Sequence, residues 1–340
     1  MLAAVVTALR RGWPWLVGAA ILALIATRIP VDAFRDAVGH GPHLRLGLVT
    51  LGLTVTMLCT DSVTVWIGLL ALRIRRPIEH VFAIRGATYL LVIINYALGQ
   101  GAFGLYLGRT GIKGARAAGS TLFLVGTNLA ALMLVTLGVW LIGGGDPAYR
   151  TLWWTLVIGC SAFAAYLVVV ALAPPFLAQQ PLLAPFFEAG VRGHVIAVIG
   201  RLPHTAMMIM APWVAIRAWG IEVPIAAAAS LMPVVAIATV LPISPAGLGT
   251  TQAALVYFFT AYASAAHILA FSVVYFVYGV VASALVGMIA TAFARRFGIL
   301  AGYHGRDEVR PAGDDGHRML VLDASGGPDA DAGRAVVQQQ

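Results

Sequence analysis

The segment 241–252 combines helix-breaking residues with polar groups and lies between two strongly apolar runs. Its chemistry-bearing residues are Pro242, Ser244, Gly247, Gly249 and Gln252. Prolines and glycines packed this closely cannot continue a regular helix. In hydrocarbon, the backbone groups freed by a break must be satisfied by protein or by a water-filled cavity. We therefore predict that this segment presents polar groups to a substrate at mid-depth in a membrane. The alternative is a structural kink satisfied by neighbouring helices.

A second group of small and amide residues interrupts the apolar run 81–107. Asn95 and Gln100 carry amides that can bind a hydroxyl-rich or phosphate group, and Gly99, Gly101 and Gly104 allow close backbone approach. This group is the predicted partner of the first segment in a substrate site. Ordinary packing of small residues between helices is the alternative.

Asp61 and Arg85 are charges inside apolar runs. A charge near the centre of a bilayer costs about 2.5–3.5 kcal/mol on insertion scales, so it usually faces the protein interior and pairs. Thr60 and Ser62 flank Asp61 and suggest a polar helix face. We expect Arg85 to pair with Asp61 or to attract a lipid phosphate, because a guanidinium suits phosphate recognition. An interfacial, snorkelling Arg85 is the alternative.

Arg201 and His204 stand three residues apart in another apolar segment, and this spacing places them on one helical face. A buried, hydrogen-bonding His204 is the favoured interpretation, and a proton-carrying His204 is the alternative.

Asp32, Asp36, His40 and His43 have a spacing that could hold a metal or form the acidic loop of a membrane glycosyltransferase, and the first three fall on one helical stripe. Gly39 and Gly41 interrupt this stripe. The polar face of an interfacial helix explains it better.

The composition of the chain indicates that the helices carrying these residues lie in a membrane. The chain is 60% hydrophobic and only 11% charged, with a mean hydropathy of +0.88, whereas soluble domains carry about 25% charged residues. We predict an all-α, polytopic transmembrane helix bundle with about six full spans and two broken or re-entrant helix pairs. The six spans are expected at 13–29, 45–72, 117–143, 152–173, 194–219 and 267–294, and the broken pairs at 81–107 and 222–265. Residues 1–297 form the membrane domain, and 298–340 form a polar tail, expected to be disordered and cytoplasmic.

Basic residues cluster at the ends of these segments, which argues against a nucleic-acid partner despite the sequence pI of about 9.9. All the clusters share one side of the membrane if both broken pairs return to the face from which they entered. The positive-inside rule then makes that side, and both termini, cytoplasmic. The clusters are Arg10 and Arg11; Arg73, Arg75 and Arg76; Arg109, Lys113 and Arg116; and Arg295 and Arg296.

The stretch 241–259 resembles the signature of the lysylphosphatidylglycerol synthase transmembrane family, also described as flippase-like. It reads Leu-Pro-Ile-Ser-Pro-Ala-Gly-Leu-Gly followed by an apolar helix, and the helix carrying Asn95 matches another family element. The resemblance covers about residues 10–297. It implies movement of a polar lipid head group between leaflets.

Three family positions that are ionisable are neutral here, among them Gln252 in place of an acidic residue. These departures favour a neutral or sugar-bearing head group. Some relatives carry a soluble aminoacyl-transferase domain that this chain lacks, so lipid aminoacylation is not expected.

We therefore expect a bacterial inner-membrane protein that moves or exposes a polar lipid, with glycosylated and polyprenyl-linked lipids among the candidates. A membrane lipid is the expected partner, and a further membrane protein or lipid-modifying enzyme is a second. No cofactor is expected. No phosphate-binding glycine loop is present, so we do not expect ATP-driven pumping by this chain alone. Two alternatives stay open. One is an accessory subunit of a lipid- or glycan-modifying complex that does not itself transport. The other is a membrane-embedded transferase using Asp61, Glu188 or the Asp/His stripe.

Overall fold

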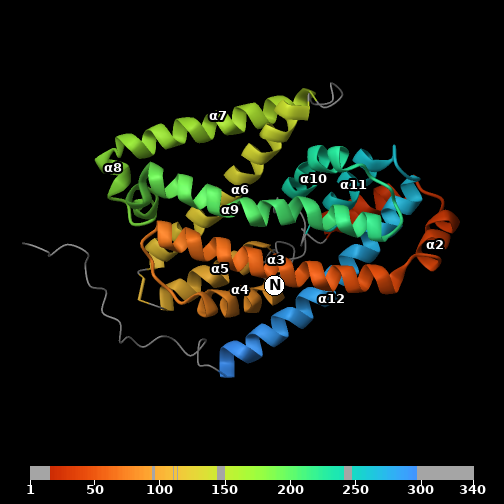
Figure 1. Ribbon diagram of the computed structural model, residues 1–340, viewed down its shortest axis with the longest axis horizontal. Helices are drawn as coiled ribbons and strands as arrows, with labels where there is room; N and C mark the ends of the chain where they lie inside the picture. The colour runs from red at the N-terminus through yellow and green to blue at the C-terminus, as the bar shows by residue number, and fades with distance from the viewer. Residues whose placement is uncertain are drawn as a thin grey trace, which may run out of the picture. The chain divides into compact units, whose positions relative to one another are not determined.

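Every regular element in the described part of the chain is a helix, which confirms the all-α class (Figure 1). The structure is a computed structural model, and it describes residues 16–93, 96–109, 111–112, 114–143, 150–240 and 247–296. A helix at Leu16–Ala26 comes first. It is followed by α2 (Val31–Gly39), α3 (His43–Ala71), α4 (Ile78–Val92), α5 (Tyr96–Arg109), α6 (Gly114–Gly143), α7 (Arg150–Leu172), α8 (Pro175–Ala178), α9 (Ala184–Ala218), α10 (Ile225–Val240), α11 (Thr250–Phe259) and α12 (Ala265–Arg296).

Five of these helices are long and apolar enough to cross a membrane, namely α3, α6, α7, α9 and α12. The protein is therefore a multi-pass helical bundle. The first predicted span, 13–29, is not one straight helix in its described part. The helix there ends at Ala26, and α2 follows it at an angle of 102°. Pro30 stands directly before α2. The described residues contain six candidate spans if this bent pair is counted as one span, and five if it is not.

The span predicted at 194–219 is longer than expected. Helix α9 begins at Ala184, and its first turns are set off by a kink at Gly190, which has φ 58° and ψ −177°. This is a left-handed φ that glycine adopts without a steric penalty. The predicted span left these turns out, since proline and glycine, found here at 185 and 190, are both unfavourable inside a helix.

Both predicted broken regions consist of two helices joined by a break. Helices α4 and α5 pack against each other, and a Cβ added to Gly99 of α5 would lie 2.3 Å from Val92 Cγ2 of α4. Residues on either side of the break therefore meet, and the chain reverses as a helical hairpin. Helices α10 and α11 also pack against each other.

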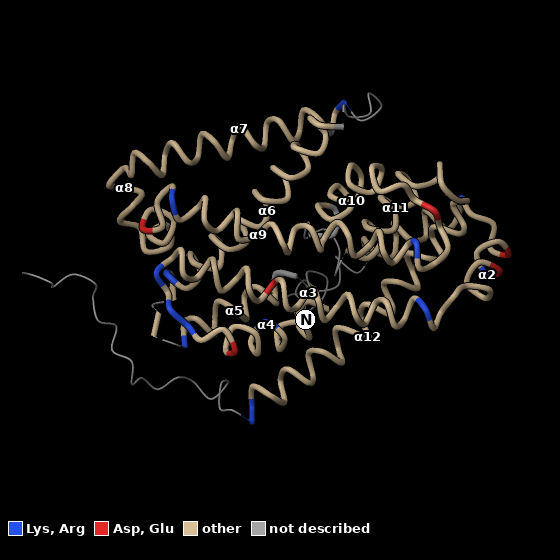
Figure 2. The backbone as a smooth tube through the Cα atoms, in the orientation of Figure 1, with Lys and Arg blue, Asp and Glu red and all other residues tan. Residues whose placement is uncertain are grey.

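Two large apolar cores fill the described part of the bundle, and a smaller one surrounds Ile29, Ala266 and Leu269. One joins α10 and α11 to the C-terminal half of α9 and the N-terminal halves of α3 and α12, with Ile216, Met232 and Phe271 fully buried. The other joins α4 and α5 to parts of α3, α6 and α9 around Leu69 and Phe103. Each broken pair thus belongs to a different core. Charged residues lie mostly towards the helix ends, as Figure 2 shows.

Candidate functional site

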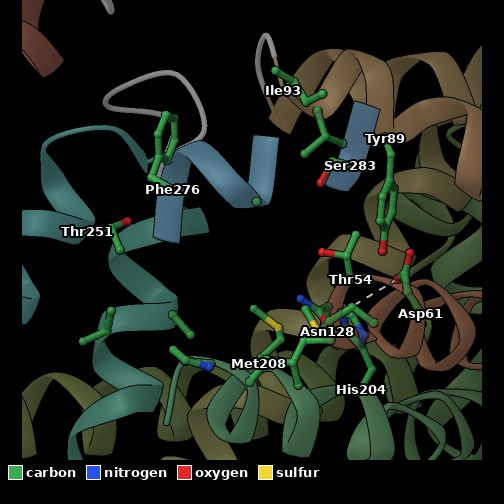
Figure 3. A pocket seen from close by; sticks show the side chains of 18 of the residues that line it. Thr54, Asp61, Tyr89, Ile93, Asn128, His204, Met208, Thr251, Phe276 and Ser283 are labelled. Carbon is green, nitrogen blue, oxygen red and sulfur yellow. Dashed lines mark ion pairs between the residues drawn. The ribbon is translucent and has the colours of Figure 1, made fainter. Parts of the chain in front are cut away.

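A cavity of about 400 Å³ lies where the two apolar cores meet (Figure 3). Its walls include residues from both cores, for example Val65 and Phe103 from one and Val235 and Leu255 from the other. Both broken pairs reach it, since Val92 and Ile93 stand at the end of α4, and Thr251 and Gln252 open α11. Its polar lining residues are Thr54, Asp61, Arg85, Tyr89, Gln100, Asn128, Arg201, His204, Thr251, Gln252, Ser272, Tyr275 and Ser283.

Asp61 on α3 is the centre of a buried ion cluster in this cavity. Arg85 of α4 donates to Asp61 Oδ2 through Nε at 2.7 Å, and its Nη2 lies 2.5 Å from the same oxygen. On the other side, Arg201 Nη1 of α9 lies 3.4 Å from Oδ1. His204 Nε2 lies 3.9 Å from Oδ1, and Figure 3 draws this contact. The two predicted charges therefore pair, and α9 adds two further groups to them.

Further contacts fix both guanidinium groups. Arg201 donates from Nη1 to Thr64 Oγ1 and from Nη2 to the carbonyl oxygen of Leu124, both at 3.2 Å. Arg85 Nη1 lies 3.5 Å from Gln100 Oε1, and its guanidinium lies 5.5 Å from the centre of the Phe103 ring. The cluster therefore ties together α3, α4, α5, α6 and α9, and a buried charge network of this kind is stable only when each member keeps its partners.

Glycines bring the helices close enough for these contacts. A Cβ added to Gly200, next to Arg201, would lie 2.6 Å from Ile67 Cγ2 of α3. One added to Gly86, next to Arg85, would lie 2.4 Å from the Cβ of Ala290 on α12. Small residues allow this close packing between membrane helices.

Arg201 lies well away from the C-terminus of α9 and from its kink. It stands 17 residues from the C-terminal residue Ala218 of α9 and 11 from the kink at Gly190. At 1.5 Å per residue these separations are about 25 Å and about 16 Å. The residue is only 4% exposed. The charge of Arg201 is therefore held inside the protein.

The predicted site residues divide into three groups. Asp61, Arg85, Gln100 and Gln252 line the cavity. Gly101, Gly247 and Gly249 are not among the described lining residues. The remaining three, Asn95, Pro242 and Ser244, lie outside the described residues. Gly101 is exposed, with nothing near an added Cβ.

Gly247 and Gly249 shape the backbone at the break. Both have a left-handed φ, of 73° and 87° respectively. A Cβ on Gly249 would lie 2.6 Å from the carbonyl oxygen of Gly18 in the first helix. The Gly249 N–H donates to Gln252 Oε1 at 2.6 Å, which caps α11. This capping engages the amide oxygen of Gln252, so the NH₂ group is the part of that side chain that could meet a ligand.

Asn128, Arg201 and His204 were not among the predicted binding residues, yet all three line the cavity. The sequence held a signal for two of them, an arginine in an apolar segment with a histidine three residues later on the same face. Asn128 is 7% exposed, and its Oδ1 has no hydrogen-bond partner among the described residues.

The cavity lining is charged, although Gln252, at a family position that is usually acidic, is neutral. Among the described residues that line the cavity, two guanidinium groups face one carboxylate, a formal excess of one positive charge with His204 neutral. The neutral Gln252 suggested an uncharged site. The charges come instead from helices far away in the sequence.

The Asp32, Asp36 and His40 stripe forms no metal site. Within the described ranges, no group of His, Cys, Asp and Glu is arranged to hold a metal ion. His40 Nδ1 and Asp36 Oδ1 form an exposed surface pair at 2.9 Å, as expected for the polar face of an amphipathic helix.

No protein-family model matches the chain, and no curated protein matches it either. The resemblance to the lysylphosphatidylglycerol synthase family therefore stays a prediction.

Proposed function

We propose that this protein holds the polar head group of a membrane lipid in the cavity between its two broken helix pairs, and moves or exposes that lipid across the bilayer. The observation that carries the proposal is the buried Asp61–Arg85–Arg201 cluster on the wall of a cavity inside a multi-pass bundle. Intramembrane ionisable residues that face a cavity typically mark a substrate path.

The size of the cavity supports a head group as the occupant. A volume of about 400 Å³ lies at the lower end of the range of about 300–1,000 Å³ for small-molecule sites. It suits a polar head while the acyl or prenyl chains stay in the surrounding lipid. We infer a bacterial inner-membrane location with both termini cytoplasmic from the basic clusters at the segment ends.

A non-transporting accessory subunit is the second candidate, and α7 is the observation that favours it. This helix makes its main contacts with α6 and α9, and it exposes Trp154, Ile158, Val168 and Leu172. A partner membrane protein could cover that face. The transferase alternative has less support, because Asp61 is engaged by two arginines and Glu188 pairs with Arg116 at the surface.

A transport assay with a cavity-filling variant tests the proposal. Gly279 of α12 lines the cavity, and nothing lies within 4 Å of an added Cβ. Gly279→Leu should therefore fill the cavity without disturbing the helix packing. Gly138→Leu is the matched control, since Gly138 also has open space around it and is not among the lining residues.

The assay uses proteoliposomes with lipids labelled on the acyl chain and a membrane-impermeant quencher that reads the outer leaflet. The lipids tested are phosphatidylglycerol, phosphatidylcholine and a glucosyl diacylglycerol. We expect the wild type and Gly138→Leu to move at least one lipid faster than protein-free vesicles do, and Gly279→Leu to lose that activity. Equal rates of lipid movement in the protein-free vesicles and in all three protein samples would refute transport and favour the accessory-subunit candidate.

A further inference from the structure

The side chain of His204, on α9, faces two different groups of α3 through its two ring nitrogens. Its Nδ1 lies 3.3 Å from Thr60 Oγ1, and its Nε2 lies 3.9 Å from Asp61 Oδ1. The single hydroxyl hydrogen of Thr60 is directed at the backbone carbonyl oxygens of Thr56 and Met57, at 3.0 and 3.1 Å. Thr60 Oγ1 is therefore the acceptor in its contact with His204, and the ring hydrogen lies on Nδ1.

This tautomer leaves His204 Nε2 as an acceptor that faces another acceptor. A neutral imidazole has one N–H group and one bare nitrogen. The bare Nε2 faces a carboxylate oxygen of Asp61, and Figure 3 draws the contact. Two acceptors form no hydrogen bond, whereas a proton added to Nε2 turns it into a donor to Asp61. The pair of His204 and Asp61 is therefore arranged to take up one proton.

Arg201 holds the carboxylate oxygen that a protonated His204 needs. Its Nη1 lies 3.4 Å from Asp61 Oδ1, and its guanidinium also donates to two other acceptors, on α3 and α6, both at 3.2 Å. Arg201 can therefore leave Oδ1 and keep two hydrogen bonds. Asp61 in turn keeps Arg85, which donates to its other oxygen, Oδ2.

The charges around His204 decide between these two arrangements. Burial and the positive charges of Arg201 and Arg85 oppose a charge on the ring, and the carboxylate of Asp61 favours one. Tyr89 of α4 also lines the cavity and lies close enough to Asp61 to feel its charge. The ring is therefore neutral while Arg201 stays on Asp61, and a charged ring requires that contact to open.

The other helices that pack against α9 contribute no charge to this balance. Within their described ranges, α8 and α10 carry no titratable residue. Helix α6 carries only Arg116, which pairs with Glu188 at the surface. On α7, the Tyr166 hydroxyl contacts His194, which lies ten residues before His204 on α9, a separation of about 15 Å.

We propose that His204 Nε2 binds a proton from the cavity, and that the protonated ring takes the Asp61 Oδ1 contact that Arg201 holds in this structure. The proton forms an N–H bond with the lone pair of Nε2, and no covalent bond of the protein breaks. The proton returns to water when Arg201 pairs with Asp61 again. His204 and Arg201 both line the cavity, so the proton decides whether the Arg201 Nη1 donor is bound to Asp61 or open to the cavity.

A proton site in this position would let a proton gradient drive the cavity through its cycle. Intramembrane Asp and His residues form the proton relays of pumps and transporters. The inference goes beyond the proposed function, which names no energy source. Only the coupling to lipid movement rests on that function, since proton binding at His204 does not depend on what the cavity carries.

Nitrogen NMR of the full chain in lipid nanodiscs, with isotope-labelled histidine, tests the proton site. The His204 signals are those that disappear in His204→Asn and those that change in Thr60→Val, so either variant identifies them. We expect a protonated Nδ1 and a bare Nε2 at about pH 8, and both nitrogens protonated as the pH falls to about 4. Thr60→Val removes the acceptor for Nδ1, so part of the neutral ring should carry its hydrogen on Nε2 instead.

Two results of this titration would overturn the proposal. A bare Nδ1 and a protonated Nε2 at alkaline pH in the wild type would show the wrong tautomer. An Nε2 that stays bare over the whole pH range in which the protein is folded would exclude proton binding. Arg201→Gln tests the exchange, because removing the competitor should raise the proton affinity of His204 about tenfold or more, a shift of about one pH unit. An unchanged or lower affinity would contradict the exchange.

The proteoliposome assay tests the coupling separately, with a pH difference of about one unit across the vesicle membrane. At one proton per lipid, this difference shifts the distribution of labelled lipid between the leaflets by up to about tenfold. We expect the shift in the wild type and in His40→Asn, whose histidine side chain is 84% exposed, and we expect no shift in His204→Asn. Lipid movement in the wild type that ignores the gradient would overturn the coupling and leave the proposed function standing. No lipid movement at all would refute the proposed function and the coupling together, and the NMR titration alone would then decide the proton site.

Discussion

Asp61 and Arg85 should be strongly coupled in the free energy of unfolding. Asp61→Asn leaves the Arg85 and Arg201 guanidinium groups, whose side chains are 7% and 5% exposed, without their counter-charge. Removing one partner of a buried ion pair costs about 3–5 kcal/mol. Arg85→Gln should cost less, about 1–3 kcal/mol, because Asp61 still faces Arg201 and keeps a partner.

The double variant Asp61→Asn/Arg85→Gln should lower the free energy of unfolding by less than the sum of the two single changes. Two unit charges about 4 Å apart interact by about 4 kcal/mol at the effective dielectric of protein sites, which sets an upper limit for the coupling. Because both variants that carry Asp61→Asn lack the carboxylate charge facing Arg201, we expect a coupling energy of about 2–4 kcal/mol.

Denaturant-induced unfolding in detergent micelles, followed by circular dichroism, measures the four free energies of this cycle. The matched control is the pair Arg116 and Glu188, whose side chains are 43% and 39% exposed. Exposed pairs contribute about 0–1 kcal/mol, so the coupling in the Arg116→Gln/Glu188→Gln cycle should be small. If the Asp61–Arg85 coupling were no larger than this control, the cluster would not be the buried charge network described above.

Three further substitutions test the packing that positions the site, each by the same unfolding measurement. Gly86→Leu should destabilise the bundle by about 1–3 kcal/mol or more, because its Cβ would press on Ala290; unchanged stability would contradict the close contact of α4 with α12. Gly249→Ala should lower the free energy of unfolding by about 1–3 kcal/mol, since φ is 87° at this residue. Unchanged stability would exclude that backbone conformation. Tyr166→Phe removes the 2.6 Å contact between the Tyr166 hydroxyl and His194 Nε2 and should cost about 1 kcal/mol; an increase in stability would show that this contact does not hold α7 to α9.

The helices that the sequence predicted best are those set by local composition. The span predicted at 117–143 is observed as α6 from Gly114, and that predicted at 267–294 is observed as α12, Ala265–Arg296. Apolar length is a local property, so these segments can be identified without knowledge of their neighbours. The two breaks were also found locally, from glycine, proline and amide residues.

The site was only partly predictable, because it depends on contacts between distant residues. Arg201 lies 140 positions from Asp61, and nothing in the local sequence states that the two meet. Gly249 was predicted to face a ligand, whereas the structure uses it for a left-handed turn against the first helix. A glycine in a break is compatible with either use, and only the packing around it decides between them.

The most direct test of a lipid head group in the cavity is mass spectrometry of the lipids retained by the gently purified protein, compared among the wild type, Gly279→Leu and Gly138→Leu. We predict that the wild type and Gly138→Leu retain one polar lipid above its share in the membrane, and that Gly279→Leu loses it. The same retained lipids in all three proteins, in the proportions of the bulk membrane, would contradict the assignment of the cavity as a lipid head-group site.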